Sequence, residues 1–353
     1  MEARLTTTTR DGRSGGATLE AVAKVAGVSR ATVSRVVNGS PKVSDDVRRA
    51  VEAAVAELGY VPNRAARSLV TRRSDSIGVV IAEPSGRLFT DPFFPRVLRG
   101  ISAHLASRQL QLVLLMPAAG ETNATADYLA AGHVDGALLV SLHDDDPLPG
   151  RIADAGIPMV VSPRPRRALD ASYVDVDNTG GAHSAVAHLA GHGRRVIATV
   201  AGPQDMAPGV DRLTGYREAL REAHLEADPS LEAVADFTQE GGAAAMERLL
   251  AARPDIDAVF AASDLMAAGA LAVLAAAGRR VPEDVAVAGF DDSPVAGTTR
   301  PALTSVRQPI EEMGEEMARL LVTAIEGQDR APRRVILATQ LIRRASSAGR
   351  RVP

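Results

Sequence analysis

Apolar residues recur with helical spacing near the N-terminus of the chain. Between residues 19 and 26 they stand at positions i, i+3, i+4 and i+7, which predicts an amphipathic helix with Thr18 as its N-cap. Gly27 permits a tight turn, and Ser29 can cap a second helix with three inward valines, Val33, Val36 and Val37. Two short helices joined by a glycine-containing turn are typical of a helix-turn-helix.

A third helix is predicted between Ser44 and Gly59. Ser44 can cap its N-terminus, Asp45 and Asp46 stand in the first turn where negative charge is favourable, and Gly59 ends it. Apolar residues repeat along one side of this helix: Val47, Ala50, Val51, Ala54, Val55 and Leu58. The three inner faces can therefore close one small hydrophobic core over residues 18–62.

The outer side of the second helix carries residues that suit DNA: Arg30, Ala31, Ser34, Arg35 and Asn38. Arginine offers two donors to a guanine edge, and serine or asparagine suits phosphates or bases. The solvated face of an ordinary three-helix module would look the same, so this face alone leaves both interpretations open. Residues 1–17, which precede the first helix, show no periodicity and are expected to be a disordered tail.

Residues 63–73 form a segment whose helix is conditional. Asn63 can cap a helix of less than two turns, which falls below the ~12 residues that an isolated helix needs in water. Such a segment should be helical only when something packs against it. Arg64 and Arg67 suit phosphates, and Leu69 could act as an apolar wedge in a minor groove. A plain interdomain linker is the alternative.

Beyond residue 74, continuous apolar runs alternate with helical patterns. The strand-like runs are 76–82, 110–115, 136–140, 158–161, 196–200, 258–261 and 285–290, and the helical segments include 94–107, 179–191, 212–223, 241–252, 265–277 and 310–325. This alternation predicts an α/β architecture with parallel sheets that helices cover on both faces. Two such sheets fit within residues 74–345 and give two Rossmann-like lobes with a cleft between them.

Two carboxylates follow strands of the expected second lobe. Asp264 comes after the strand that ends at Ala261, and Asp291 comes after the strand that ends at Phe290. Ligands of open α/β sheets lie at the carboxyl ends of the strands, so both side chains could face one cleft. Paired carboxylates can perform acid–base chemistry or accept hydrogen bonds from a polyol or a base. Binding is favoured, and no cofactor is expected, because no nucleophile, metal triad or cofactor loop stands beside them.

Charge is divided unevenly along the chain of 353 residues. Residues 1–73 hold 13 Lys and Arg against 7 Asp and Glu, a net charge of +6, whereas the whole chain is at −3. A basic head on an acidic body suits a unit that binds phosphates.

The sequence has no cysteine, no apolar run near the ~18 residues of a membrane span and no signal-peptide core, so a cytoplasmic protein without membrane contact is expected. His188 and His192 lack an H-E-x-x-H arrangement and are interpreted as structural.

Two stretches carry a family resemblance. VAKVAGVSRATVSRVVNG (22–39) and LGYVPNRAARSL (58–69) match without a gap the headpiece and hinge of the LacI/GalR family, the lac-repressor and purine-repressor type regulators. The blocks DPFFPRVLRGI (91–101), DRLTGYREAL (211–220) and VPEDVAVAGFDDSP (281–294) resemble the effector domain of the same family. The resemblance covers about residues 18–345, which is nearly the whole chain.

The resemblance implies a periplasmic-binding-protein-like effector domain whose chain crosses between the lobes three times, near Asp177, Ser305 and Arg330. Lobe 1 would then hold residues 74–177 and 306–330, lobe 2 residues 178–305 and 331–345, and residues 346–353 would form a tail. The residues that match effector-contacting positions are Phe93, Phe94, Arg212, Phe237, Asp264 and Asp291. Core packing of the phenylalanines and surface salt bridges of the charged residues are the alternatives. The DNA-contacting set is expected to be Thr18, Ser29, Arg30, Ala31, Thr32, Ser34, Arg35, Asn38, Ser44, Tyr60, Asn63, Arg67 and Leu69.

Together with the resemblance, these observations predict a homodimeric, sequence-specific DNA-binding transcriptional regulator, and the resemblance implies that it is a repressor. It should bind a pseudo-palindromic operator in double-stranded DNA, with an affinity controlled by a small effector, a sugar or sugar derivative first and a purine or nucleoside second. An enzyme would need a turnover-competent group in the cleft, and a solute-binding receptor would need an export signal. A regulator controlled by a protein partner, with a vestigial cleft, is the remaining alternative. No heptad tail follows Ser346, so a dimer is favoured over a coiled-coil tetramer.

Overall fold

The protein divides into two compact units, residues 1–73 and residues 74–353. The structure is a computed structural model that describes residues 17–37, 42–61, 73–117, 122–328 and 331–348. Residues 1–16 of the expected tail at 1–17, and residues 63–72 of the conditional segment at 63–73, lie outside the described residues. Among the described residues, no helix has both the length and the apolar character that a membrane crossing requires.

The first unit contains the three predicted helices, α1 (Leu19–Ala26), α2 (Arg30–Val37) and α3 (Asp45–Leu58). Thr18 caps α1, because its hydroxyl oxygen accepts a hydrogen bond of 3.2 Å from the Ala21 N–H. Gly27 ends α1 and Gly59 ends α3, both in the left-handed region that glycine adopts most easily. Their inner faces close one core of buried side chains: Val22, Ala23, Val33, Val36, Val51, Ala54 and Tyr60.

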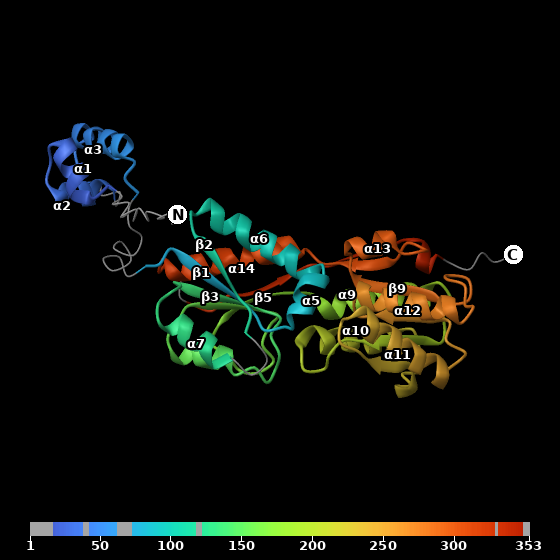
Figure 1. Ribbon diagram of the computed structural model, residues 1–353. Helices are drawn as coiled ribbons and strands as arrows, with labels where there is room; N and C mark the ends of the chain where they lie inside the picture. The colour runs from blue at the N-terminus through green and yellow to red at the C-terminus, as the bar shows by residue number, and fades with distance from the viewer. Residues whose placement is uncertain (1–16, 38–41, 62–72, 118–121, 329–330, 349–353) are drawn as a thin grey trace, which may run out of the picture. The chain divides into compact units, whose positions relative to one another are not determined.

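The second unit is built on two six-stranded sheets, one in each lobe (Figure 1). Lobe 1 contains β1 (Ser76–Ile81), β2 (Gln111–Leu115), β3 (Gly136–Val140), β4 (Met159–Ser162), β5 (Ser172–Val176) and β11 (Arg334–Leu337), in the order β11-β5-β4-β3-β1-β2. Lobe 2 contains β6 (Ile197–Ala201), β7 (Glu232–Val234), β8 (Ala258–Ala261), β9 (Ala286–Asp291), β10 (Thr304–Arg307) and β12 (Gln340–Ile342), in the order β12-β10-β9-β8-β6-β7. All pairs are parallel except β10 with β12, which confirms the predicted parallel-sheet fold class.

Helices cover both faces of each sheet. In lobe 1, α6 (Phe93–Ser107) and α14 (Ile310–Ile325) share one core with the sheet, and α7 (Thr122–Ala130) and α8 (Leu148–Asp154) cover the opposite face. In lobe 2, α9 (Asn178–Gly191) and α10 (Ala207–Glu222) lie on one face, and α11 (Gln239–Ala252) and α12 (Asp264–Ala276) lie on the other. Two short helices, α5 (Ser85–Thr90) and α13 (Pro294–Thr298), follow β1 and β9.

Glycine allows α6 and α14 to approach at backbone distance. A Cβ atom on Gly100 would lie 1.9 Å from the carbonyl oxygen of Glu311, and one on Gly314 would lie 2.3 Å from that of Val97. Real Cβ atoms do not reach such distances, so any larger residue at either position would force the helices apart. The two helices therefore form one tightly packed pair over the sheet of lobe 1.

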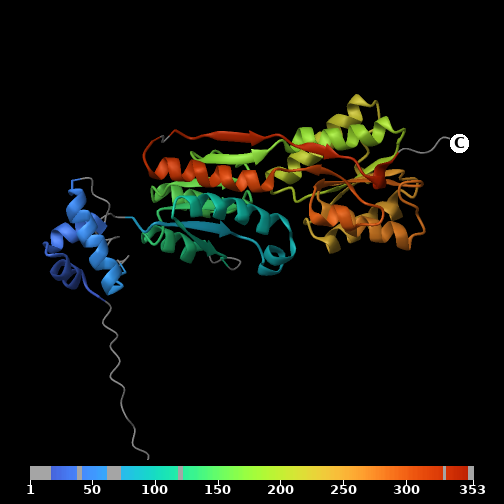
Figure 2. The same cartoon turned by 90° about the horizontal axis from the view of Figure 1, so that it is seen from above.

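The C-terminal part of the chain departs from the predicted lobe boundaries. Residues 331–345 were assigned to lobe 2, but β11 pairs with β5 in the sheet of lobe 1 and only β12 joins lobe 2 (Figure 2). The third crossing therefore lies between β11 and β12, and the second lies after Arg307, because β10 still pairs with β9. Ser346, placed in a tail, is buried, and its hydroxyl contacts the Thr304 N–H and the Val287 carbonyl. In the sequence, apolar residues after position 334 can indicate strands. They do not indicate which of the two sheets each strand joins.

Candidate effector cavity and DNA-reading face

The outer face of α2 presents part of the predicted DNA-contacting set. Arg30, Ala31 and Arg35 are exposed, and Arg30 forms an ion pair of 3.1 Å with Glu20 on α1. Thr32 and Ser34 are partly exposed on the same helix, and Ser44 is exposed at the start of α3. The Ser29 hydroxyl accepts a hydrogen bond from the Thr32 N–H at 3.1 Å, so Ser29 caps α2 as predicted.

The remaining predicted DNA contacts fall elsewhere. Tyr60 is 8% exposed in the core of the first unit, so its ring stabilises the three-helix fold and is not displayed on the surface. Four residues of the set lie outside the described residues: Asn38, Asn63, Arg67 and Leu69.

The second unit has a cavity of about 570 Å³ between its lobes, including the part open to solvent. The lining combines charged, polar and apolar side chains: Arg87, Asp91, Phe93, Ser141, Ser162, Pro163, Asp175, Asn178, Met206, Pro208, Arg212, Phe237, Ser263, Asp291, Gln308 and Met313. Most of these residues follow the carboxyl ends of strands in both sheets, the usual place for a ligand in an open α/β sheet.

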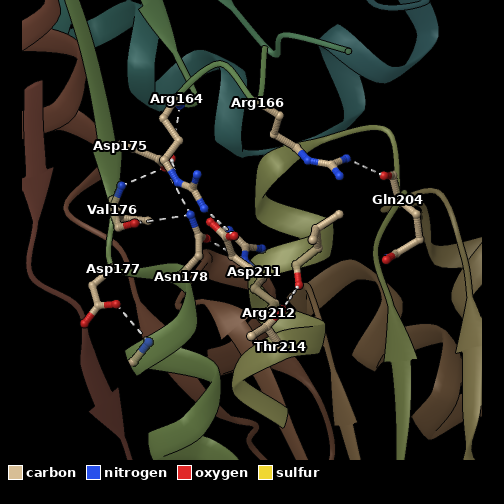
Figure 3. Close-up of polar contacts among 12 residues, drawn as sticks. Arg164, Arg166, Asp175, Val176, Asp177, Asn178, Gln204, Asp211, Arg212 and Thr214 are labelled. Atoms are coloured by element: carbon tan, nitrogen blue, oxygen red, sulfur yellow. Dashed lines mark hydrogen bonds and ion pairs between the residues drawn. The ribbon is translucent and has the colours of Figure 1, made fainter. Parts of the chain in front are cut away.

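Arg212 on α10 is held inside the cavity wall (Figure 3). Its Nε donates to the Asn178 side-chain oxygen at 2.9 Å, and Nη1 donates to the Ala262 carbonyl at 2.6 Å. Nη1 also lies 3.5 Å from a carboxylate oxygen of Asp291, and the guanidinium lies 3.7 Å from the ring centroid of Phe290. These contacts fix the plane of a buried guanidinium, which can then donate to a ligand from a defined direction.

The carboxylates of the cavity lie in a partly dry environment. Burial raises the pKa of Asp291 to about 6 against the opposing effect of the Arg212 charge. Burial also raises the pKa of Asp175 to about 6, although this carboxylate accepts hydrogen bonds from the Arg164 and Val176 N–H groups. Desolvated carboxylates of this kind are strong acceptors for hydroxyl groups that enter the cavity.

Asp264 and Phe94 do not line the cavity, in contrast to the prediction. Asp264 is fully buried, and its two oxygens accept hydrogen bonds from the Ser305 hydroxyl at 2.5 Å and the Ser293 N–H at 2.7 Å. Burial, with the Asp291 charge second, raises the pKa of Asp264. Phe94 packs in the core of lobe 1, while Phe93 and Phe237 face the cavity. Phe237 holds φ at +65°, a strained conformation for a non-glycine residue.

Several lining residues were missed by the sequence analysis. Asp175 and Asn178 stand where β5 leads into α9, and Gln308 follows β10 and donates to Asp291 at 2.5 Å. Arg87 and Asp91 come from α5 and the residue after it. A search for polar residues directly after every strand, including the short ones, would have found Asn178 and Gln308, whereas Asp175 lies within β5.

A set of contacts, here called the cross-lobe bridge, joins loops of lobe 1 to lobe 2. His143 Nδ1 lies 2.7 Å from the Asp205 carboxylate. Arg166 Nη1 donates to the Gln204 carbonyl at 2.8 Å (Figure 3). Arg164 Nη2 donates to Asp211 at 2.5 Å. The other ring nitrogen of His143, Nε2, lies 3.2 Å from a carboxylate oxygen of Glu83. The hydrogen bonds that His143 donates to Glu83 and Asp205 raise the pKa of His143 to about 9, so the ring is a cation at neutral pH.

The histidines singled out as structural have protein partners. His188 Nε2 lies 2.8 Å from the Ser347 hydroxyl, and burial lowers the pKa of His188 to about 4. Across the part of the chain that the structure describes, no group of three or more His, Cys, Asp or Glu could hold a metal ion.

A helix-turn-helix unit joined to a two-lobed body with a polar cavity defines a ligand-responsive DNA-binding regulator. Residues 18–63 match the family described as bacterial regulatory proteins, lacI family, and residues 186–347 match the periplasmic binding protein-like domain. The chain belongs to the lacI family and is a sequence-specific DNA-binding transcriptional regulator.

Relatives match over almost the whole chain. The HTH-type transcriptional regulator CelR of Thermobifida fusca is 54% identical, over 93% of this chain and 98% of CelR. The HTH-type transcriptional repressor CytR of Escherichia coli K12 is 34% identical, over 94% and 96%. Among solved structures, a CelR–cellobiose complex has a TM-score of 0.76 at 52% identity, over 93% of this chain and 99% of that one. The lac repressor dimer bound to operator and an anti-inducer has a TM-score of 0.80 at 28% identity, over 94% and 98%.

Proposed function

We propose that this chain is a cytoplasmic, homodimeric repressor that binds a pseudo-palindromic operator and releases it when a neutral sugar, cellobiose or a close analogue, occupies the cavity. The observation that carries the proposal is the pairing of a sugar-compatible cavity with 54% identity to CelR, a relative that has been solved with cellobiose. The cavity is proposed to bind its ligand without turnover. The residues Phe93, Phe237, Arg212 and Asp291 are proposed as effector contacts.

The chemistry of the lining supports a neutral polyol. The rings of Phe93 and Phe237 can cover the apolar face of a pyranose. The Arg212 guanidinium can donate to hydroxyl oxygens, and the carboxylate of Asp291 can accept from hydroxyl groups. A purine or nucleoside could stack on the same rings, and this is the second candidate. A regulator that responds to a protein partner would not need this concentration of buried charge in the cleft.

The test combines calorimetry with operator binding. Cellobiose should bind the purified full-length protein and weaken its affinity for a cognate operator at fixed salt, whereas maltose, lactose and adenosine should do neither. The mechanism requires a difference in cellobiose affinity between the free and the operator-bound protein, because only such a difference shifts the equilibrium. Binding of adenosine alone would favour the nucleoside alternative, and tight operator binding that no sugar or nucleoside changes would favour a protein partner.

An anionic sugar should be rejected. Three carboxylates, Asp91, Asp175 and Asp291, line the cavity against the two guanidiniums of Arg87 and Arg212, so a further negative charge would be repelled. Cellobionate should therefore bind at least about tenfold more weakly than cellobiitol, which has the same open-chain end without a charge; tenfold corresponds to ~1.4 kcal/mol. Equal affinities of the two compounds by calorimetry at pH 8, which is above the pKa of about 6 of Asp175 and Asp291, would contradict the proposed charge balance.

A further inference from the structure

We infer that Arg87 is a second arginine that contacts the effector, contributed by lobe 1, and that it selects one particular oxygen of the sugar. The inference rests on the proposed function, because the ligand it concerns is the sugar in the cavity. Arg87 belongs to α5, a short helix without the apolar periodicity that reveals a long one, and it lines the cavity opposite Arg212 of lobe 2.

The Arg87 side chain is held in place but retains a donor. It is only 15% exposed, and its Nη1 donates to the Glu83 carboxylate at 2.8 Å. Its Nε lies 3.9 Å from an oxygen of Asp91, too far for a hydrogen bond. That Nε is buried and has no hydrogen-bond partner among the described residues. A buried donor without an acceptor is unfavourable, so an oxygen that reaches it from the cavity would be bound strongly.

Aromatic rings of both lobes fix the position of the Arg87 guanidinium. It lies 5.8 Å from the ring centroid of Phe94 in lobe 1 and 5.5 Å from that of Phe237 in lobe 2. The Arg212 guanidinium lies 5.7 Å from the same Phe237 ring. Phe237 therefore lies close to one arginine from each lobe, so we expect a sugar that contacts its ring to be within reach of both guanidiniums.

The expected chemistry is a charge-assisted hydrogen bond from Arg87 Nε to one hydroxyl oxygen of the sugar. Hydrogen bonds to charged groups have a larger net effect than neutral ones, and losing this one should weaken binding about 10- to 100-fold. Lysine at this position would keep the positive charge beside Glu83 but would not reproduce the fork of guanidinium donors.

The test measures coupling between Arg87 and individual sugar oxygens. Cellobiose and a set of monodeoxy cellobioses are titrated by calorimetry into the full-length wild type, Arg87→Gln, Arg87→Lys and the control Arg167→Gln. Arg167 is an exposed arginine of lobe 1 that pairs with Asp145 and does not line this cavity. Thermal unfolding of each variant shows whether it is folded.

In the wild type, at least one deoxy analogue should bind about tenfold or more weakly than cellobiose. Arg87→Gln and Arg87→Lys should bind that analogue and cellobiose with equal affinity, because the donor to the oxygen that the analogue lacks has been removed. Arg167→Gln should behave as the wild type. The inference would be overturned if Arg87→Gln bound cellobiose with the wild-type affinity. It would also be overturned if the substitution lowered the affinity for cellobiose and for every analogue by the same factor. A wild type that binds no cellobiose would overturn the proposed function and this inference with it.

Discussion

Arg212→Ala is expected to abolish the effector response and to destabilise the second unit. The substitution removes a buried cation and leaves the Asp291 carboxylate, the Asn178 oxygen and the Ala262 carbonyl without their shared donor. Breaking a buried pair by removing one partner costs about 3–5 kcal/mol. Urea unfolding should show this loss of stability, and calorimetry should show cellobiose affinity reduced by more than about a hundredfold.

A matched control lies on the same helix. Arg217 of α10 is half-exposed and pairs with Glu232 at the surface, so Arg217→Ala should change stability by no more than about 1 kcal/mol and leave the effector affinity unchanged. An Arg212→Ala protein that unfolds at the wild-type urea concentration would show that the cavity does not depend on this cation. One that binds cellobiose normally would remove Arg212 from the proposed effector site.

Arg35→Ala is expected to reduce specific operator binding far more than binding to random DNA. Arg35 is exposed on the outer face of α2, where its guanidinium can donate two hydrogen bonds to a guanine edge. The loss on the cognate site should be roughly 1–3 kcal/mol, whereas contacts to phosphate alone would weaken both kinds of DNA alike. Fluorescence anisotropy at several salt concentrations measures both affinities and the salt slope.

The control for this experiment is Arg49→Ala. Arg49 is an exposed arginine of α3 that forms an ion pair with Asp46 within the same helix. The Arg49→Ala substitution removes the same charge from the first unit and leaves the outer face of α2 unchanged. It should therefore lower the affinities for cognate and for random DNA by a similar small factor. Equal losses on cognate and random DNA for Arg35→Ala would assign Arg35 to the phosphates.

The sequence was sufficient for continuous apolar runs and long helices, and insufficient for short strands that contain polar residues. Runs such as 136–140 and helical patterns such as 310–325 were predicted with the bounds that the structure has, because a continuous buried run or several apolar turns leave little alternative. The strands β5, β7 and β12 have only three to five residues, and neighbouring strands determine their pairing. Such long-range pairing leaves no local pattern.

Single residues of the candidate site show the same limit of prediction from the sequence. Phe93 and Phe94 are adjacent, and successive helical residues point about 100° apart, so only one of the two rings faces the cavity. Asp264 and Asp291 both follow strands, but the hydroxyl of Ser305 and the N–H of Ser293 satisfy the Asp264 oxygens inside the lobe. These details depend on contacts between residues far apart in the chain.

The place where the chain enters lobe 1 determines how a ligand signal can leave the cavity. Ser74 and Asp75 donate backbone hydrogen bonds to the Asp135 carboxylate at the start of β1, and the cavity lies beyond the other end of this six-residue strand. The two points are separated by about 20 Å of strand. Because β1 is paired on both sides, a local change in a cavity loop would be lost along that distance. We therefore expect lobe 1 to move as a rigid body when the effector binds, and the effector to act on the DNA-binding unit through rotation of this whole lobe.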